Sequence, residues 1–382
     1  MDDVELIVVA NGCTDNTFSY LTYLNTAIPN ILRIIWFKDP LGFPRAVNEC
    51  ISRSKGDKVV ILNNDTVLLE QEKNTWLKRL DMGGITSVLT QYSPITKSRF
   101  GVFFCTMIDR EVFKNIGHLN EVYKTGGCED IEFCHLAEKK GFKINDCGWQ
   151  GDFPIYHAAE GTMHDETLVK NWKDTFYKNQ LHLAKKFNLD HYRFLLSNNY
   201  ERAVFLKGDE VFPREKQRYE WAAKNVTGNS IFEIGCTTGY GRQFLPDYIN
   251  YLGLDYDPII VDVAKEQDWD GPNNLFVNGD INEFILGQYD TIIAFEVIEH
   301  LDNGLEIVEK LKQHCKRLLI TVPHNEPKGF WGEHHKLHGL TEKDFPGFTF
   351  EYINHAGDIT NICQVVDEKN LSNLMLCCYD NE

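Results

Sequence analysis

The stretch 230–255, SIFEIGCTTGYGRQFLPDYINYLGLD, decides the fold of the second half of the chain. An apolar run carrying an acid at Glu233 stops at Gly235, and a glycine-rich turn follows at Gly239. About twenty residues after Glu233, a second apolar run ends in Asp255. This order of strand, glycine turn, helix, strand and acid is typical of units that bind an adenosine-containing ligand. Glycines also close ordinary turns, so the acid at this spacing is what favours the nucleotide interpretation.

Bulk properties narrow the class of protein. With 382 residues, the chain is long enough for two or three domains, and its formal net charge of -17 argues against a nucleic-acid groove. No apolar run approaches the roughly eighteen residues of a membrane span, and the first residues lack the basic segment of a signal peptide. The eleven cysteines form no CxxC pair, which predicts reduced thiols and a cytoplasmic protein.

The first half of the chain alternates strands and helices. Apolar strands are predicted at 4–9, 31–37 and 58–62, with helices between them, which indicates a mainly parallel sheet. Polar clusters at 11–15 and 63–65 follow two of these strands, where ligands of such sheets bind.

Later segments of the same half add a buried strand at 100–108 and a short strand that ends at His157. The loop TGGCED places Glu129 and Asp130 at the start of a helix, where acids either cap the first turn or point into a cleft. A long amphipathic helix is predicted at 168–187.

The second half is predicted to alternate in the same way. Its strands fall near 231–234, 250–254, 274–278, 289–294 and 317–322, and an antiparallel pair at 350–359 and 374–379 closes the sheet.

The pieces VELIVVANGCTDNT, LGFPRAVNECI, GDKVVILNNDT, GGCEDIEFCHLAEKKGF and YHAAEGT together resemble a family 2 glycosyltransferase of the GT-A fold, from Asp3 to about Leu189. The resemblance implies a nucleotide-sugar donor, whose diphosphate needs a divalent cation, Mn or Mg, on hard ligands. The implied metal residues are Asp65, Asn63 and His157. Asp130 is the implied base of an inverting displacement, with Glu129 orienting the acceptor. The implied nucleotide-sugar residues are Asn11, Asp15, Arg45, Asn48 and Asn64.

Two features depart from that family. Its first strand, which precedes the strand at 4–9, is expected to be missing here, and Ala10 replaces an acid. We therefore expect weakened donor binding or a truncated sequence.

From Phe212 to Glu382 the chain resembles class I S-adenosylmethionine-dependent methyltransferases. Beside the opening stretch, the matching pieces are NGDI at 278–281, YDTIIAFEVIEHL at 289–301 and RLLITV at 317–322. The resemblance implies that Asp255 holds the ribose of S-adenosyl-L-methionine and that Asp280 and Ile281 hold its adenine. The full set of implied cofactor residues is Glu233, Gly235, Cys236, Gly239, Asp255, Tyr256, Asp280, Ile281 and Glu296.

Three interpretations remain open for Glu299, His300 and the later segment EHHKLH (333–338). With Glu296, they resemble sites in which two glutamates and two histidines hold magnesium on acceptor hydroxyls. Alternatively, His300 or His335 is a general base without metal. In the third interpretation His300 caps a helix and the later segment is a solvated loop.

The sequence therefore predicts an α/β protein of two domains: a GT-A domain at 1–189, a linker at 190–211 and a Rossmann-like methyltransferase domain at 212–382. The function predicted is transfer of a sugar to a glycan or glycolipid acceptor and O-methylation of a sugar hydroxyl, within polysaccharide biosynthesis. One alternative is a methyltransferase whose GT-A domain is inactive and binds only the acceptor. Another is a glycan-binding scaffold without activity. No nucleic-acid partner and no transmembrane segment are predicted.

Overall fold

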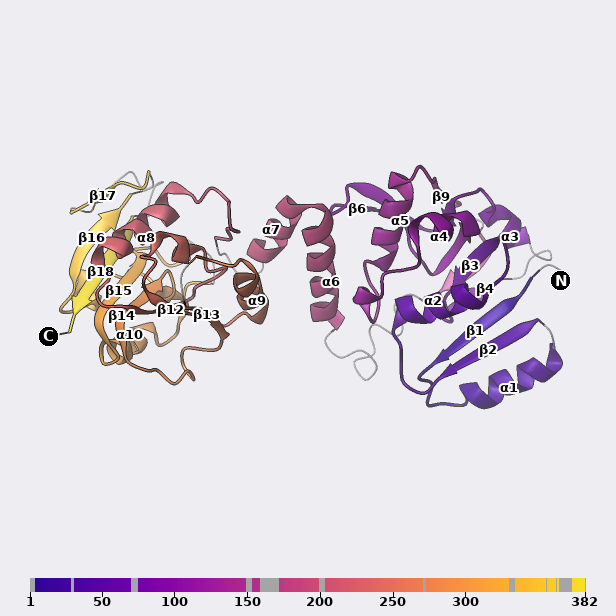
Figure 1. The fold of residues 1–382 in the computed structure, drawn as a ribbon, viewed down its shortest axis with the longest axis horizontal. Helices are drawn as coiled ribbons and strands as arrows, with labels where there is room; N and C mark the ends of the chain where they lie inside the picture. The colour runs from indigo at the N-terminus through magenta and orange to yellow at the C-terminus, as the bar shows by residue number, and fades with distance from the viewer. Residues whose placement is uncertain are drawn as a thin grey trace. The chain divides into compact units, whose positions relative to one another are not determined.

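The computed structural model in Figure 1 forms two compact units, Met1–Leu195 and Leu196–Glu382. It describes residues 4–28, 31–69, 75–148, 153–158, 172–198, 203–270, 273–329, 334–354, 356–361, 363 and 373–381. Part of the motif YHAAEGT and Glu333 of EHHKLH lie outside the described residues. None of the described helices is both long and apolar enough to cross a bilayer.

Unit 1 begins with the two strands predicted at its start. These strands, β1 (Leu6–Asn11) and β2 (Leu32–Phe37), pair in parallel with each other, and helix α1 (Thr17–Ala27) connects them. Helix α2 (Phe43–Arg53) leads to β3 (Lys58–Leu62), which belongs to a different sheet, of order β3-β8-β5-β9. That sheet contains β5 (Ile85–Ser87), β8 (Cys105–Asp109) and β9 (Ile144–Asp146).

The prediction of a mainly parallel sheet in unit 1 is wrong. Strand β8 runs antiparallel to both β3 and β5, and only β5 and β9 pair in parallel within that sheet. The strand predicted at 100–108 is interrupted at 102–104, where Phe104 N donates to Val102 O at 2.9 Å. Its two parts pair with different neighbours, because β7 (Ser98–Gly101) pairs with β6 (Thr90–Ser93) while β8 joins the larger sheet.

Further elements belong to unit 1, and the last of them continues past the end of this unit at Leu195. They are β4 (Thr66–Leu68), α3 (Thr75–Leu80), α4 (Arg110–Ile116), a 3₁₀ turn (Glu121–Tyr123), α5 (Glu129–Lys139), β10 (Ile155–His157), α6 (Trp172–Phe187) and α7 (Leu189–Asn198). Helices α4 and α5 pack through Val112, Phe113 and Phe133 into one core with Ile61 of β3 and Ile108 of β8. Helix α7 occupies the start of the region for which a linker is predicted.

Unit 2 is a single eight-stranded sheet of order β13-β12-β11-β14-β15-β18-β16-β17. Its parallel part consists of β11 (Ser230–Ile234), β12 (Asn250–Asp255), β13 (Asn273–Asn278), β14 (Tyr289–Phe295) and β15 (Cys315–Pro323). Strand β18 (Leu374–Asp380) runs antiparallel between β15 and β16 (Thr349–Ile353), and β17 (Ile359–Thr360) ends the sheet. All five predicted parallel strands are thus confirmed, as is the antiparallel pairing of the segments near 350 and 374–379. The single strand predicted at 350–359 is wrong, because this segment forms β16 and β17, which pair with each other.

Helices cover both faces of this sheet. They are α8 (Pro213–Asn225), α9 (Pro258–Glu266) and α10 (Gly304–Lys312), with short 3₁₀ turns at Tyr240–Phe244, Ile298–His300 and Glu342–Asp344. Two apolar clusters result, one containing Trp221 of α8 and Val261 of α9, the other containing Val308 of α10. The strand order reverses at β11, whose neighbours are β12 and β14, and parallel sheets bind ligands at the carboxyl ends of strands around such a reversal.

One local prediction in unit 2 is wrong. The glycine turn after β11 leads into the 3₁₀ turn Tyr240–Phe244 rather than a full α-helix.

Candidate functional sites

A carboxylate and an imidazole face each other in unit 1. Strand β10 pairs antiparallel with β4, which places His157 opposite Thr66 and beside Asp65. His157 Nε2 lies 3.1 Å from Asp65 Oδ1, and both atoms are buried without a hydrogen bond to any residue that the structure describes. The imidazole stacks on Phe104 with ring centroids 4.2 Å apart. A carboxylate oxygen and an imidazole nitrogen are ligand types that divalent cations accept, and the cation predicted for this pair stays a prediction.

The third predicted metal ligand, Asn63, is half-buried in the turn after β3, and its backbone carbonyl accepts the Thr66 hydroxyl at 2.6 Å. Asn64 is exposed in the same turn.

Two acids begin helix α5. Glu129 is buried and its Oε2 has no hydrogen-bond partner, whereas Asp130 Oδ1 accepts the Ile131 amide at 2.8 Å. Burial raises the pKa of both carboxyls above the ordinary range, and the Asp130 charge raises that of Glu129 further. Cys128 precedes them with φ of +80°, a left-handed conformation that a side chain rarely adopts. An acid held in such surroundings suits a general base.

The other predicted nucleotide-sugar residues have structural partners. Asn11 Oδ1 accepts the Leu41 amide at 2.6 Å, and exposed Asp15 accepts the amide of Thr17 at the start of α1. Asn48 is buried, and its side chain both donates to and accepts from the backbone of Leu119, at 2.9 and 3.0 Å. These three side chains hold loops and a helix start. Arg45 is half-exposed, 4.0 Å from the carboxylate of Glu121.

The glycine turn of unit 2 has the backbone that its sequence requires. Gly235 and Gly239 have φ of +71° and +75°, and a side chain at either would overlap neighbouring atoms. The amides of Gly235 and Cys236 both donate to Leu254 O, which ties the turn to β12. Cys236 is buried, with its sulfur in the core beneath the turn.

Asp255 ends β12 beside this turn. Its Oδ2 accepts the Thr237 amide at 3.0 Å and its Oδ1 accepts the Asp257 amide at 3.0 Å. Thr237 has φ of +48°, and its buried hydroxyl has no hydrogen-bond partner. Tyr256 is exposed. The unsatisfied hydroxyl beside Asp255 is a feature that a bound polar ligand would resolve.

The predicted adenine residues differ in environment. Asp280 is exposed and accepts the Asn282 amide at 2.8 Å, whereas Ile281 is buried in the core.

Glu233, in the middle of β11, accepts hydrogen bonds from two tyrosines. The hydroxyls of Tyr219 and Tyr251 donate to its Oε1 and Oε2 respectively, and all three side chains are buried. Burial raises the pKa of Glu233, and the two phenol hydrogen bonds oppose that rise. The pairing gives Glu233 a role in the packing of α8 and β12 against β11.

A polar cluster lies at the exit of β14. Glu299 is buried, and within the described part of the chain neither of its carboxyl oxygens takes part in a hydrogen bond. One of these oxygens and a ring nitrogen each of His300 and His335 all lie within 4.8 Å of one another. Glu296 has φ of +53°, and its Oε1 accepts the Thr321 hydroxyl at 3.0 Å. Burial raises the pKa of Glu299 well above its usual value, and the charges of Glu296 and Glu326 raise it further. Burial lowers the pKa of His300 to about 4. The solvated-loop interpretation is wrong for His335, which is only 9% exposed.

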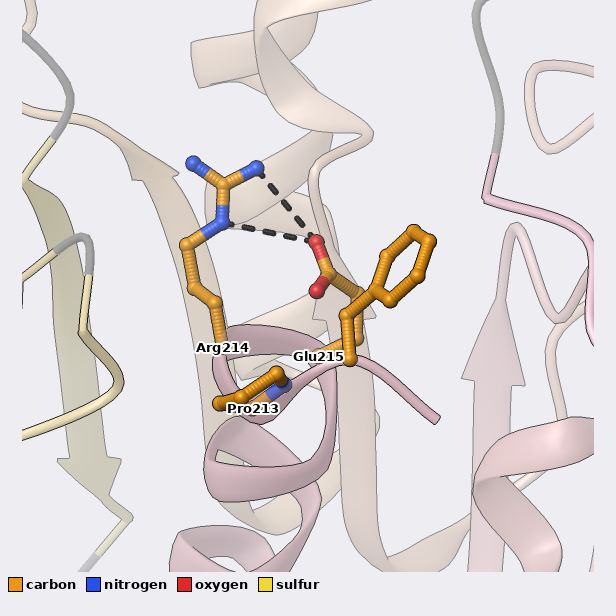
Figure 2. Close-up of a pocket in the computed structure, with 4 residues that line it drawn as sticks. Pro213, Arg214 and Glu215 are labelled. Atoms are coloured by element: carbon orange, nitrogen blue, oxygen red, sulfur yellow. Dashed lines mark hydrogen bonds and ion pairs between the residues drawn. The ribbon is translucent and has the colours of Figure 1, made fainter. Parts of the chain in front are cut away.

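The start of α8 supplies cationic groups that sequence reasoning missed. Arg218 is buried, its guanidinium donates to the Tyr240 hydroxyl, and its Nε has no hydrogen-bond partner. Both Arg218 and Arg214 lower the pKa of Glu296, against the larger raising effect of burial. Figure 2 shows Arg214 directed over the carboxylate of Glu215, at 3.4 Å, beside a hollow of about 210 Å³ lined by Phe212, Pro213, Arg214 and Glu215. In the sequence, Arg218 and Tyr219 stand side by side in an amphipathic helix. This pattern does not reveal that the Arg218 side chain is buried.

Two family models each match part of the chain. Residues 1–100 match the model for glycosyl transferase family 2, and residues 232–317 match a methyltransferase domain. The chain joins a family 2 glycosyltransferase domain to a methyltransferase domain. The architecture is therefore a mixed α/β GT-A unit followed by a Rossmann-like class I unit. The methyltransferase match also supports S-adenosyl-L-methionine as a cofactor.

A curated relative in Mycolicibacterium smegmatis, described as a "probable S-adenosylmethionine-dependent methyltransferase", is 30% identical over 111 residues. The match covers 28% of this chain and 40% of that protein's length. Similar solved structures include the N-methyltransferase NodS from Bradyrhizobium japonicum WM9 with S-adenosyl-L-homocysteine (16% identity, TM-score 0.36, 44% of this chain and 85% of that chain). Another is a TehB-like methyltransferase from Corynebacterium glutamicum (18% identity, TM-score 0.34, 51% and 96%).

Proposed function

We propose that the chain is a bifunctional glycan-modifying enzyme. Unit 1 transfers a sugar from a nucleotide-sugar donor, and unit 2 methylates a sugar hydroxyl with S-adenosyl-L-methionine. The observation that carries the proposal is the pair of unsatisfied polar centres, Asp65 with His157 in unit 1 and Glu299 with two histidines in unit 2. Buried polar groups without partners are rare in folded proteins and are common where a ligand completes them.

In unit 2 the acceptor oxygen attacks the methyl carbon of the sulfonium, the carbon–sulfur bond breaks, and the hydroxyl proton passes to a base. Positioning dominates such a displacement, so the protein must hold both reactants and accept one proton. A base with a pKa near 4 is a weak proton acceptor at neutral pH, which disfavours His300. We therefore assign the proton to His335.

The same donors also fit a divalent cation. One carboxylate and two imidazoles within 4.8 Å are a suitable ligand set, and a positive charge would compensate the buried Glu299, Glu296 and Glu326 carboxyls. A cation held there would acidify an acceptor hydroxyl. Calorimetric titration with Mn²⁺ is made in the Asp65→Asn background, which removes the cation ligand proposed for unit 1. Cation binding there that is lost on adding Glu299→Gln supports the metal version, and no binding supports the base alone.

The cofactor site is tested by ligand truncation. We assign the methionine carboxylate to Arg218, whose buried Nε is unsatisfied, and the ribose to Asp255. S-adenosyl-L-homocysteine and 5′-methylthioadenosine share the adenosine, but only the former has the carboxylate. Arg218→Gln should weaken the former at least tenfold more than the latter, whereas Asp255→Ala should weaken both alike. Equal losses of affinity for both ligands in Arg218→Gln would refute the assignment of the methionine carboxylate to Arg218.

For unit 1 the base is Asp130, assisted by Glu129, and Asp65 with His157 would hold a cation that neutralises the donor diphosphate. Mn²⁺-dependent hydrolysis of a nucleotide sugar should be lost in Asp65→Asn. The matched control is Asp81→Asn, which removes an exposed acid paired with Lys58 in the same unit. Absence of UDP and GDP binding by calorimetry would refute donor use.

That result would favour the second candidate, a methyltransferase whose first unit binds only the acceptor. Two features favour this candidate. Strands β1 and β2 form a sheet of their own, and Asn11 and Asn48, predicted to bind the nucleotide sugar, instead hydrogen-bond to loop backbone. Labelled S-adenosyl-L-methionine with a panel of glycosides, with and without nucleotide sugars, distinguishes the two.

A further inference from the structure

Glu326, a residue without a role in the sequence prediction, is one of the most buried acids of unit 2. It lies three residues after β15 and is 2% exposed. The Gly339 amide donates to its carbonyl at 2.9 Å, and the Asn325 amide donates to Leu340 O at 2.8 Å. These two hydrogen bonds join the segment at 325–326 to the segment at 339–340. They thereby hold Glu326 near His335, which lies a few residues before Gly339.

The carboxylate of Glu326 contacts the imidazole of His335 directly. Glu326 Oε2 lies 2.6 Å from His335 Nδ1, with both side chains buried. A carboxylate accepts hydrogen bonds, so this contact places the proton of the neutral ring on Nδ1 and leaves the lone pair on Nε2. The other oxygen, Oε1, is buried without a hydrogen bond and lies 4.0 Å from His338 Nδ1.

The ring of His335 contacts the ring of His300 within the polar cluster. It meets the ring of His300 at 4.6 Å between centroids and 86° between planes. The next two amides, of Lys336 and Leu337, donate to the carbonyl of Glu299 at 2.7 and 3.0 Å. The backbone of this segment is thereby held at the end of β14, independently of the Glu326 side chain.

We propose that Glu326 is a positioning residue for methyl transfer. It holds His335 as the Nδ1–H tautomer, with the Nε2 lone pair free for the acceptor proton or a cation. The inference rests on the proposed methyltransferase function. Acids in this outer position typically change activity or metal affinity by about 10–100-fold when removed.

The first test is nuclear magnetic resonance of the full chain labelled with [¹⁵N]histidine, with the His335 signals identified by their loss in His335→Asn. We expect long-range proton–nitrogen correlations of the Nδ1–H form in the wild type and a mixture of tautomers in Glu326→Ala. An Nε2–H form in the wild type, or no change in the variant, overturns the proposal. This readout needs no acceptor, so it stands even if no methyl transfer is found.

The second test is kinetic. Glu326→Ala should lower kcat about 10–100-fold with little change in the KM for S-adenosyl-L-methionine. Glu326→Gln, whose carbonyl can still accept from Nδ1–H, should recover part of that loss. Glu342→Ala is the matched control, because it removes an acid 3.2 Å from another histidine, His324. Equal kcat losses in Glu326→Ala and Glu342→Ala, or no recovery in a folded Glu326→Gln, would overturn the positioning role.

Discussion

Replacement of Glu233 by glutamine tests whether this acid belongs to the packing of unit 2 or to its cofactor site. Each carboxyl oxygen accepts one buried tyrosine hydroxyl, from Tyr219 and Tyr251. A glutamine amide offers one oxygen and one NH₂ group, so one tyrosine keeps its acceptor and the other faces a donor. The lost bond to a charged acceptor corresponds to about 2 kcal/mol of unfolding free energy.

For a unit of this size, about 2 kcal/mol lowers the melting temperature by about 4–8 °C. The assay is thermal unfolding of the full chain, with the transition of unit 2 identified by its upward shift on adding S-adenosyl-L-homocysteine. The cost should shrink in the Tyr219→Phe background, because the NH₂ group then no longer opposes a hydroxyl, and such coupling is measured by a double-mutant cycle. Affinity for the ligand should change less than threefold. A tenfold loss of affinity with unchanged stability would refute the packing role and make Glu233 a ligand residue.

Three further predictions concern other positions. Gly235→Ala should destabilise unit 2 by about 1–3 kcal/mol in urea unfolding, because φ is +71° and the added methyl overlaps a neighbouring side chain; unchanged stability would contradict the turn geometry. Asp130→Asn should abolish sugar transfer by at least about 100-fold yet stabilise unit 1 at alkaline pH. The reason is that burial raises the folded-state pKa of this acid, so its charge costs stability as pH rises above the ordinary carboxyl range; unfolding midpoints at pH 5 and pH 8 check the sign, and a loss at both would contradict it. Hydrogen bonding to Lys316 is the main cause that lowers the pKa of Asp290 to about 2, so its charge stabilises the fold above the unfolded pKa and this contribution is lost as pH falls through about 2. Asp290→Asn should therefore make the unfolding free energy fall less steeply with acidification. Equal slopes for the variant and the wild type below about pH 4 would refute this.

The sequence predicts much of unit 2 because its signals are local. The runs of β11 to β14 are bounded by a glycine, an acid or an asparagine, whereas β15 ends at Pro323. The predicted runs coincide with β11 to β15 within one or two residues. Asp255 is the last residue of β12 and Glu296 directly follows β14, so their places at the carboxyl edge follow from the strand assignment.

The remaining features depend on contacts between distant segments. The contact of Glu326 with His335 requires a loop whose closing amide bonds leave no pattern in the residues themselves. In unit 1 the apolar run at 100–108 looks continuous, yet it bends at 102–104 because its two halves pair with different strands. The pairing of Asp65 with His157 was predictable only through family resemblance, since 91 positions separate them and β4 and β10 bring them together.

Left-handed backbone at side-chain-bearing residues recurs at the candidate sites, at Cys128, Thr237 and Glu296. A residue other than glycine in this region costs about 1–3 kcal/mol, which the surrounding fold must offset. Glycine would relax that strain at Glu296, but it would also remove a carboxylate from the exit of β14. Stability alone would thus favour glycine at position 296, whereas the proposed function of unit 2 would favour an acid there. The strained acid makes this position a place where stability and activity evolve in opposition.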